Sequence, residues 1–119
     1  MLAGLLVLAS FFLDACASSS VERIGTTSYS PAPPNAPVFV FTDASQIKVP
    51  YEVVGIISYD NPGKYQVLSL DDAIEPLKTK AREIGANGII IKKSQPVKSG
   101  FISTGIYAEA QAIRLKNGN

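Results

Sequence analysis

The chain has 119 residues, which is enough for one small domain, and its 11 basic and 10 acidic residues leave a net charge of +1. This balance lacks the basic excess that holds a nucleic-acid backbone, so we expect no nucleic-acid partner. The chain has no histidine and one cysteine, which excludes zinc or copper sites of the imidazole or thiolate type. We therefore expect no metal, no cofactor and no enzymatic activity.

An apolar run from Leu2 to Leu13 opens the chain. A run of about a dozen residues is too short to span a bilayer as a helix, but it has the length of the hydrophobic part of an export signal. It ends at Leu13-Asp14-Ala15-Cys16, which resembles the lipobox of bacterial lipoproteins. This resemblance implies that residues 1–15 are a signal peptide and that Cys16 is lipidated. The membrane is then a partner, held through the acyl chains on Cys16.

Two alternatives to lipidation remain open from the residues. Ala15-Cys16-Ala17 fits the rule of an ordinary signal peptidase, which would release a soluble secreted protein. Without any cleavage, the apolar run would stay as an anchor. In the lipoprotein interpretation the folded domain has no disulfide, because Cys16 is the only cysteine and it is acylated.

Residues 16–37 comprise the lipidated cysteine and a stretch rich in serine and proline. Large apolar side chains are scarce there, so the stretch has little surface to bury, and proline favours extended backbone. We expect a flexible tether that reaches ~60 Å when fully extended in a polyproline form and ~27 Å as a coil. The alternative is a proline-rich ligand for a partner protein.

The folded domain is expected at 38–116, with a tail at 117–119. Its first half predicts strands separated by turn signals. Pro50 ends a helical turn, Gly55 suggests a bulge or a close contact, and Asp60-Asn61-Pro62-Gly63 has the composition of a type II turn. The expected elements are a strand at 38–41, a helical turn at 43–47, a strand at 51–59 and a short strand at 64–68.

A helix is predicted from Ser69, which can cap it together with Asp72, to Gly85, which can end it. Pro76 implies either a kink or a later start of regular helix, near 72–75. Acidic residues in the first turn (Asp71, Asp72 and Glu75) are explained by the helix dipole. The apolar stripe comprises Leu70, Ile74, Leu77, Ala81 and Ile84.

The C-terminal part predicts a buried strand at 89–91 with Lys92 and Lys93 at its rim, a surface loop at 94–100 and a long strand at 101–115. Ala108, Ala110 and Ala112 share one face of the last strand, and we place the helix over these small side chains. The apolar pattern changes phase after Ala112, which predicts a bulge. The sequence thus indicates an α+β fold, in which one main helix packs on a small four- to five-stranded, mostly antiparallel sheet in the order β-β-α-β-β.

Three segments carry a resemblance to a known family: Val38-Phe39-Val40-Phe41-Thr42-Asp43-Ala44, Pro50-Tyr51-Glu52-Val53-Val54-Gly55, and Lys80-Ala81 with Ala86-Asn87-Gly88-Ile89-Ile90-Ile91. Together they resemble the outer-membrane lipoprotein that senses envelope stress for the Rcs phosphorelay. The resemblance implies a small α/β domain at the outer membrane, since Ala17 is not the aspartate that retains lipoproteins in the inner membrane. Small heavy-metal-binding-like domains, which assemble into rings, are also similar around 81–91.

Other candidate residues have simpler explanations. Ser45-Gln46-Ile47-Lys48 and Lys98-Ser99-Gly100 match short motifs of penicillin-binding enzymes, but an S-D-N element is absent and the domain is too small. Lysines at a strand end can touch anionic groups, and aromatic residues near turns can anchor a partner or complete the core. These candidates are Lys92, Lys93, Lys98, Tyr59, Tyr65, Phe101 and Tyr107.

These observations predict a lipid-anchored protein of the cell envelope, located in the outer membrane and facing the periplasm, whose small domain binds an envelope protein partner. The most specific version is a sensor of envelope stress. The alternative is a self-assembling (homo-oligomeric) or small-ligand-binding module without a signalling role.

Overall fold

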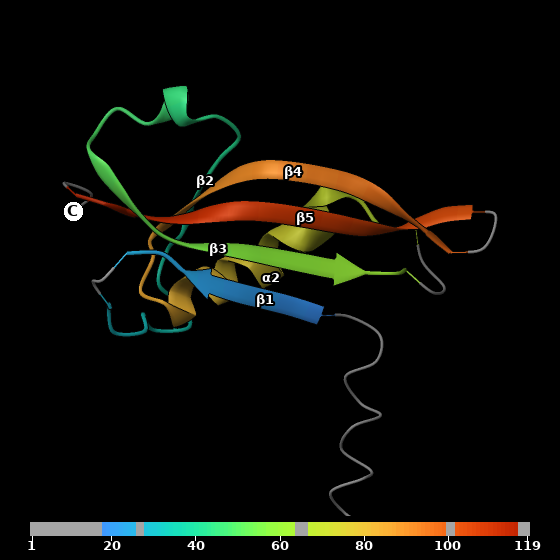
Figure 1. Ribbon diagram of the computed structural model, residues 1–119, viewed down its shortest axis with the longest axis horizontal. Coiled ribbons are helices and arrows are strands. Elements are labelled where there is room, and N and C mark those ends of the chain that lie inside the picture. Colours follow the sequence, from blue (N-terminus) through green and yellow to red (C-terminus); the bar gives the residue numbers. More distant parts are fainter. Residues whose placement is uncertain (1–17, 26–27, 64–66, 100–101, 117–119) are drawn as a thin grey trace, which may run out of the picture.

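The computed structural model describes residues 18–25, 28–63, 67–99 and 102–116. Within them, a five-stranded sheet carries one α-helix against one of its faces (Figure 1). The strand order is β1-β3-β5-β4-β2, and only the pairing of β2 with β4 is parallel. The predicted α+β fold is confirmed. The elements are β1 (Ser18–Arg23), β2 (Phe39–Phe41), the 3-10 turn η2 (Ala44–Gln46), β3 (Tyr51–Asn61), α2 (Leu70–Glu83), β4 (Gly88–Ser99) and β5 (Ile102–Leu115).

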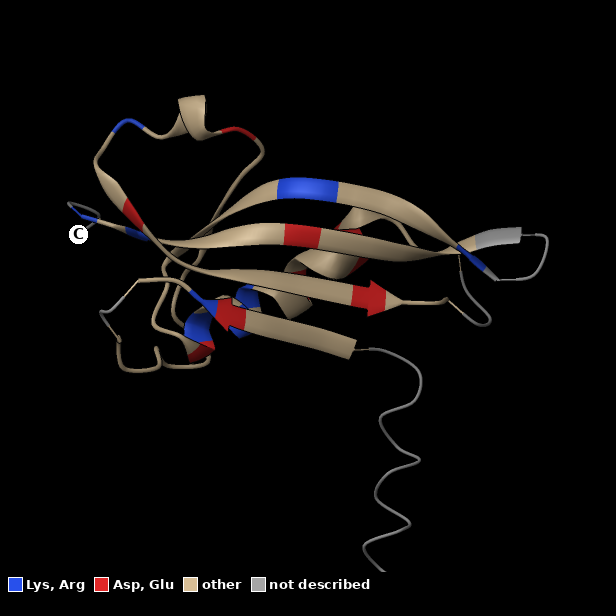
Figure 2. Cartoon of the chain, in the orientation of Figure 1, with Lys and Arg blue, Asp and Glu red and all other residues tan. Residues whose placement is uncertain are grey.

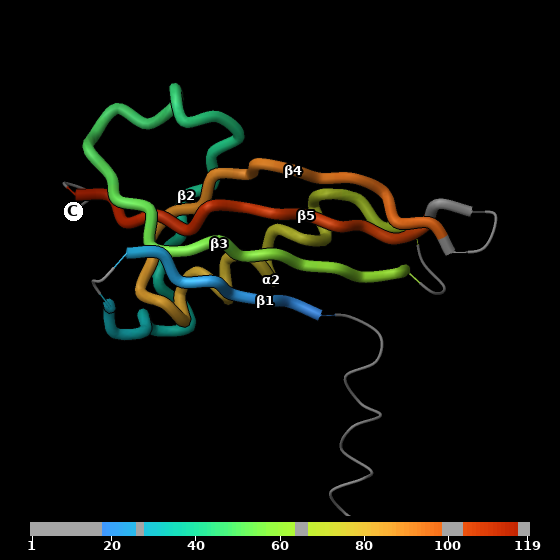
Figure 3. The backbone as a smooth tube through the Cα atoms, viewed as in Figure 1, coloured from blue at the N-terminus to red at the C-terminus, as the bar shows by residue number. Residues whose placement is uncertain are grey.

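Part of the segment expected to be a flexible tether is a strand, β1, which begins at the third residue of that segment. β1 pairs antiparallel with β3 along its whole length, with Ser18 opposite Asp60 (Figure 3). Val21 packs against the core, and the hydroxyl oxygens of Ser20 and Ser58 lie 2.6 Å apart. The prediction is wrong here because an edge strand is held by backbone hydrogen bonds to an existing sheet. Such a strand can fold with a single inward apolar side chain.

Helix α2 begins and ends at the predicted signals. The carboxylate of Asp72 accepts a 2.7 Å hydrogen bond from the backbone N–H of Ser69, and the helix continues through Pro76 rather than starting after it. At the other end Gly85 has a φ of +77°, and the N–H of Ala86 donates to the carbonyl of Ala81 at 2.9 Å. This is the hydrogen bond of a Schellman cap.

The core lies between α2 and the sheet. Ala108, Ala110 and Ala112 on β5 are completely buried beneath the helix, as the row of alanines predicted. Small side chains on the central strand let the helix backbone approach closely, so the larger side chains fill the flanks. The buried helix residues are Ala73, Leu77 and Ala81, whereas Ile74 is only half-buried.

Strand β4 is longer than predicted, because the expected loop at 94–100 continues the strand up to Ser99. β2 pairs only with positions 88–90, so the rest of β4 has a single neighbour, β5. Pro96 lies opposite Ile106 in this region. Proline is tolerated on such an edge because no further strand requires its missing N–H.

The predicted bulge lies on the neighbouring strand. The register shifts between Val53 and Gly55 of β3, opposite Ile113 and Ala112, whereas β4 pairs with these two residues of β5 without a shift. Ile113 is completely buried without belonging to the cluster beneath the helix, and it lies opposite Gly88 of β4. The change of apolar phase therefore marks burial on the second face of the sheet. The expected strand at 64–68 falls at 64–66 outside the described residues, and Val67 and Leu68 form no strand.

Candidate functional site

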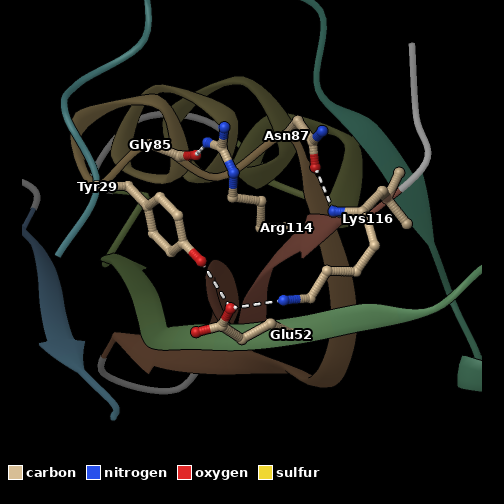
Figure 4. Close-up of polar contacts among 7 residues, drawn as sticks. Tyr29, Glu52, Gly85, Asn87, Arg114 and Lys116 are labelled. Carbon is tan, nitrogen blue, oxygen red and sulfur yellow. Dashed lines mark hydrogen bonds and ion pairs between the residues drawn. The ribbon is translucent and has the colours of Figure 1, made fainter. Parts of the chain in front are cut away.

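A polar cluster joins the N-terminal segment to the end of the sheet (Figure 4). We call it the clasp, and it comprises Tyr29, Glu52, Arg114 and Lys116. The hydroxyl of Tyr29 donates to Oε1 of Glu52 at 2.6 Å, and the Lys116 ammonium lies 3.1 Å from the same oxygen. The Arg114 guanidinium lies 4.5 Å from the centre of the Tyr29 ring. Pairing of β3 with β5 sets Glu52 directly opposite Arg114, which brings these groups together.

The same segment covers the C-terminal end of α2. Backbone carbonyls at this end of the helix accept hydrogen bonds from other parts of the chain. The Arg114 guanidinium donates to the carbonyl of Gly85 at 2.8 Å, and the N–H of Ala32 donates to the carbonyl of Arg82 at 2.8 Å. In return, Nε of Arg82 donates to the carbonyl of Ala36 at 2.7 Å. Because helix C-terminal carbonyls need such partners and favour positive charge, the segment closes the helix end.

The electrostatics of the clasp favour one protonation state. The hydrogen bond between Tyr29 and Glu52 raises the pKa of Tyr29. The same hydrogen bond lowers the pKa of Glu52, and the hydrogen bond from Lys116 lowers it further. At neutral pH the pair is therefore a neutral phenol and a carboxylate. Both pKa shifts move away from neutrality, so the pair suits fastening the chain rather than proton transfer.

A shallow groove of about 220 Å³ lies between the proline-rich segment and α2. Its lining residues are Pro31, Ala32, Pro34, Thr79, Arg82 and Glu83. Arg82 also donates through Nε to Ala36, and it thereby helps to hold one wall of the groove against the other.

The sheet face opposite the helix carries charged and aromatic side chains. Lys93 of β4 pairs with Glu109 of β5, where Figure 2 shows a basic segment beside an acidic one. The Lys93 ammonium lies 5.8 Å from the centre of the Tyr107 ring. Burial, followed by the charge of Glu109, raises the pKa of Tyr107.

The structure places several of the predicted candidates in structural roles. Tyr59 packs against the core and accepts a 2.8 Å hydrogen bond from Asn61. Asn61 also accepts from the N–H of Gly63 at 3.0 Å, as a turn residue does. Glu75 pairs with Lys78 on the surface of α2. The predicted lipidation residue Cys16 lies outside the described residues, as do the candidates Tyr65 and Phe101.

The two motifs shared with penicillin-binding enzymes do not meet. Ser45 lies on η2, in the connection from β2 to β3, whereas Lys98 lies at the far end of β4 (Figure 1). The Lys48 ammonium donates to the backbone carbonyl of Ser45 at 3.2 Å. The geometry therefore does not assemble the arrangement that these motifs have in such enzymes.

The sequence pattern does not indicate that the residues of the clasp come together. The charged members of the clasp alternate with apolar residues at the ends of two strands, and Tyr29 is an aromatic residue within a serine- and proline-rich stretch. Only the position of Tyr29 was a signal, because a tether has no need for an aromatic side chain.

The described residues define a small α+β domain in which one helix covers one face of a five-stranded mixed sheet. None of the described helices is both long and apolar enough to cross a membrane. No family model matches the chain, and no curated protein sequence matches it either. The chain is similar in structure to the Francisella virulence factor FvfA, with 12% sequence identity and a TM-score of 0.57. The similarity covers 81% of this chain and 96% of that one, and it shows the fold alone.

Proposed function

We propose that this protein is a lipoprotein of the cell envelope, anchored through Cys16, whose small non-catalytic domain binds a protein partner in the periplasm. The observation that carries the proposal is the position of the only cysteine at the end of an export-signal-like apolar run, after Leu13-Asp14-Ala15. The outer membrane is the proposed location, because Ala17 follows Cys16. Sensing of envelope stress, by resemblance to the Rcs sensor, is its most specific form.

The proposal is supported by the way the domain starts. Its first described strand begins at Ser18, close behind the proposed anchor, and the segment that follows is fastened by the clasp. Anchoring would therefore hold the domain beside the membrane, and the long reach expected of a flexible tether does not apply to the described residues.

The intact mass of the protein extracted from its native membranes tests this function. We expect a mass that corresponds to a chain starting at Cys16 plus acyl chains. A Cys16→Ser variant is the matched control, since it keeps the apolar run and loses the thiol that would be acylated. A mass without lipid, for a chain starting after residue 16 or at Met1, would refute the lipid anchor on Cys16.

Self-assembly is the second candidate, and one observation favours it. β2 forms an edge of the sheet and exposes two large apolar side chains, Phe39 at 51% and Val40 at 40%. Exposed edge strands of this kind are templates for pairing with another chain. Sedimentation of the detergent-solubilised protein distinguishes the two: a ring or dimer whose mass falls to a monomer in Val40→Lys supports assembly, and a monomer refutes it.

A further inference from the structure

Little chain separates Cys16 from the folded domain. Ser18 is the first residue of β1, and consecutive Cα atoms are 3.8 Å apart, so the Cα atom of Cys16 lies within about 7 Å of that of Ser18. If Cys16 carries the acyl chains of the proposed function, the end of the sheet at Ser18 lies at the membrane surface. This inference rests on that function and adds an orientation of the domain.

The structure identifies which other segments lie at that end. Ser18 is opposite Asp60, and β3 ends at the next residue. The hydroxyl of Thr104 donates to the carbonyl of Pro62 at 3.3 Å, and the backbone carbonyl of Thr104 accepts from the N–H of Leu68 at 2.8 Å. Pro62 and Leu68, on the two described sides of the connection from β3 to α2, are therefore held beside the beginning of β5.

Val67 directly precedes Leu68 and is 82% exposed, the highest value among the large hydrophobic residues found exposed in the described ranges. Its neighbour Leu68 is partly buried against the core, so the backbone at this point is held while the valine side chain faces outward. An apolar side chain fixed in this position is suited to the boundary between headgroups and acyl chains.

The β4–β5 hairpin reaches further in the same direction. Asp60 is opposite both Ser18 and Tyr107, and β5 begins at Ile102, five residues before Tyr107. At about 3.4 Å per residue, the hairpin extends ~17 Å beyond the level of Ser18, whereas Cys16 extends at most ~7 Å. Lys98, which is exposed and lies opposite Ser103 near the beginning of β5, therefore reaches the bilayer surface.

We propose that this end of the domain binds the bilayer surface, with Val67 in the headgroup region and Lys98 among the lipid phosphates. Asp71 and Asp72 lie in the first turn of α2, close in sequence to Val67. Net positive charge therefore does not drive the contact, which depends on the anchor and the apolar side chain. β2 pairs with the opposite end of β4, so Phe39 and Val40 lie at the end of the sheet that is farther from the membrane.

Fluorescent labels on single cysteines test the orientation. Because Cys16 is the only natural cysteine, an added cysteine in the acylated protein is the single free thiol. The variants are Val67→Cys and, as the matched control at the other end of the sheet, Val40→Cys. Each is labelled with an environment-sensitive dye and reconstituted into phosphatidylcholine vesicles containing lipids with a nitroxide on the headgroup.

We expect several-fold stronger quenching at position 67 than at position 40, together with a blue shift of the emission at 67 alone. Equal quenching at the two positions, or stronger quenching at position 40, would overturn the proposed orientation. The intact mass of the same preparation separates the two failures. A lipidated protein with unquenched Val67→Cys label refutes only the orientation, whereas a mass without lipid refutes the proposed function.

Discussion

Gly85 lies two residues beyond the last residue of α2, at the point where the N-terminal segment packs against the helix end. Substitution of Gly85 therefore measures that contact. An added Cβ would lie 2.6 Å from the carbonyl oxygen of Ser30 and 2.6 Å from the Cβ of Tyr29, where ordinary contacts begin at 3.4 Å. The left-handed backbone of an alanine costs ~1–2 kcal/mol, and displacing packed atoms typically costs ~1–3 kcal/mol. We therefore expect Gly85→Ala to lower the free energy of unfolding by about 3 kcal/mol.

Gly25→Ala is the control, because Gly25 also has a positive φ, +84°, but has nothing within 4 Å of the added Cβ. It should cost ~1 kcal/mol, the backbone term alone. In a domain of this size these values correspond to drops in Tm of roughly 12–24 °C for Gly85→Ala and 4–8 °C for Gly25→Ala, measured by circular dichroism. Equal drops for the two variants would refute the packing of the N-terminal segment on the helix end.

Two further predictions concern the clasp and the core. The lowered pKa of Glu52 means that its contribution to stability is present above the ordinary glutamate pKa near 4.5 and is lost as the pH falls through the lower folded value. In urea titrations, the stability difference between the parent and Glu52→Gln should therefore shrink in acid, and a difference that stays constant with pH would contradict this. Leu77→Ala removes a completely buried side chain and should cost ~2–5 kcal/mol in the same titrations, and a cost below ~1 kcal/mol would contradict the placement of the helix.

The local parts of the fold could be predicted because their causes lie close together in the sequence. Ser69 with Asp72 starts the helix, and Gly85 ends it, since caps depend on residues within one turn. The burial of Ala108, Ala110 and Ala112 followed from their alternation along one strand. The lipidation of Cys16 remains a prediction from sequence.

Only the tertiary structure decided the edges of the sheet and the clasp. β1 is a strand because β3 offers it a row of backbone hydrogen bonds, and no periodicity in residues 18–23 signals that partner. β4 continues past Pro96 because β5 pairs with it and β2 stops short. The clasp joins Tyr29, Glu52 and Lys116 from distant parts of the chain. The residues themselves determined the helix and the buried face, whereas features that depend on a partner far along the chain appear only when the sheet assembles.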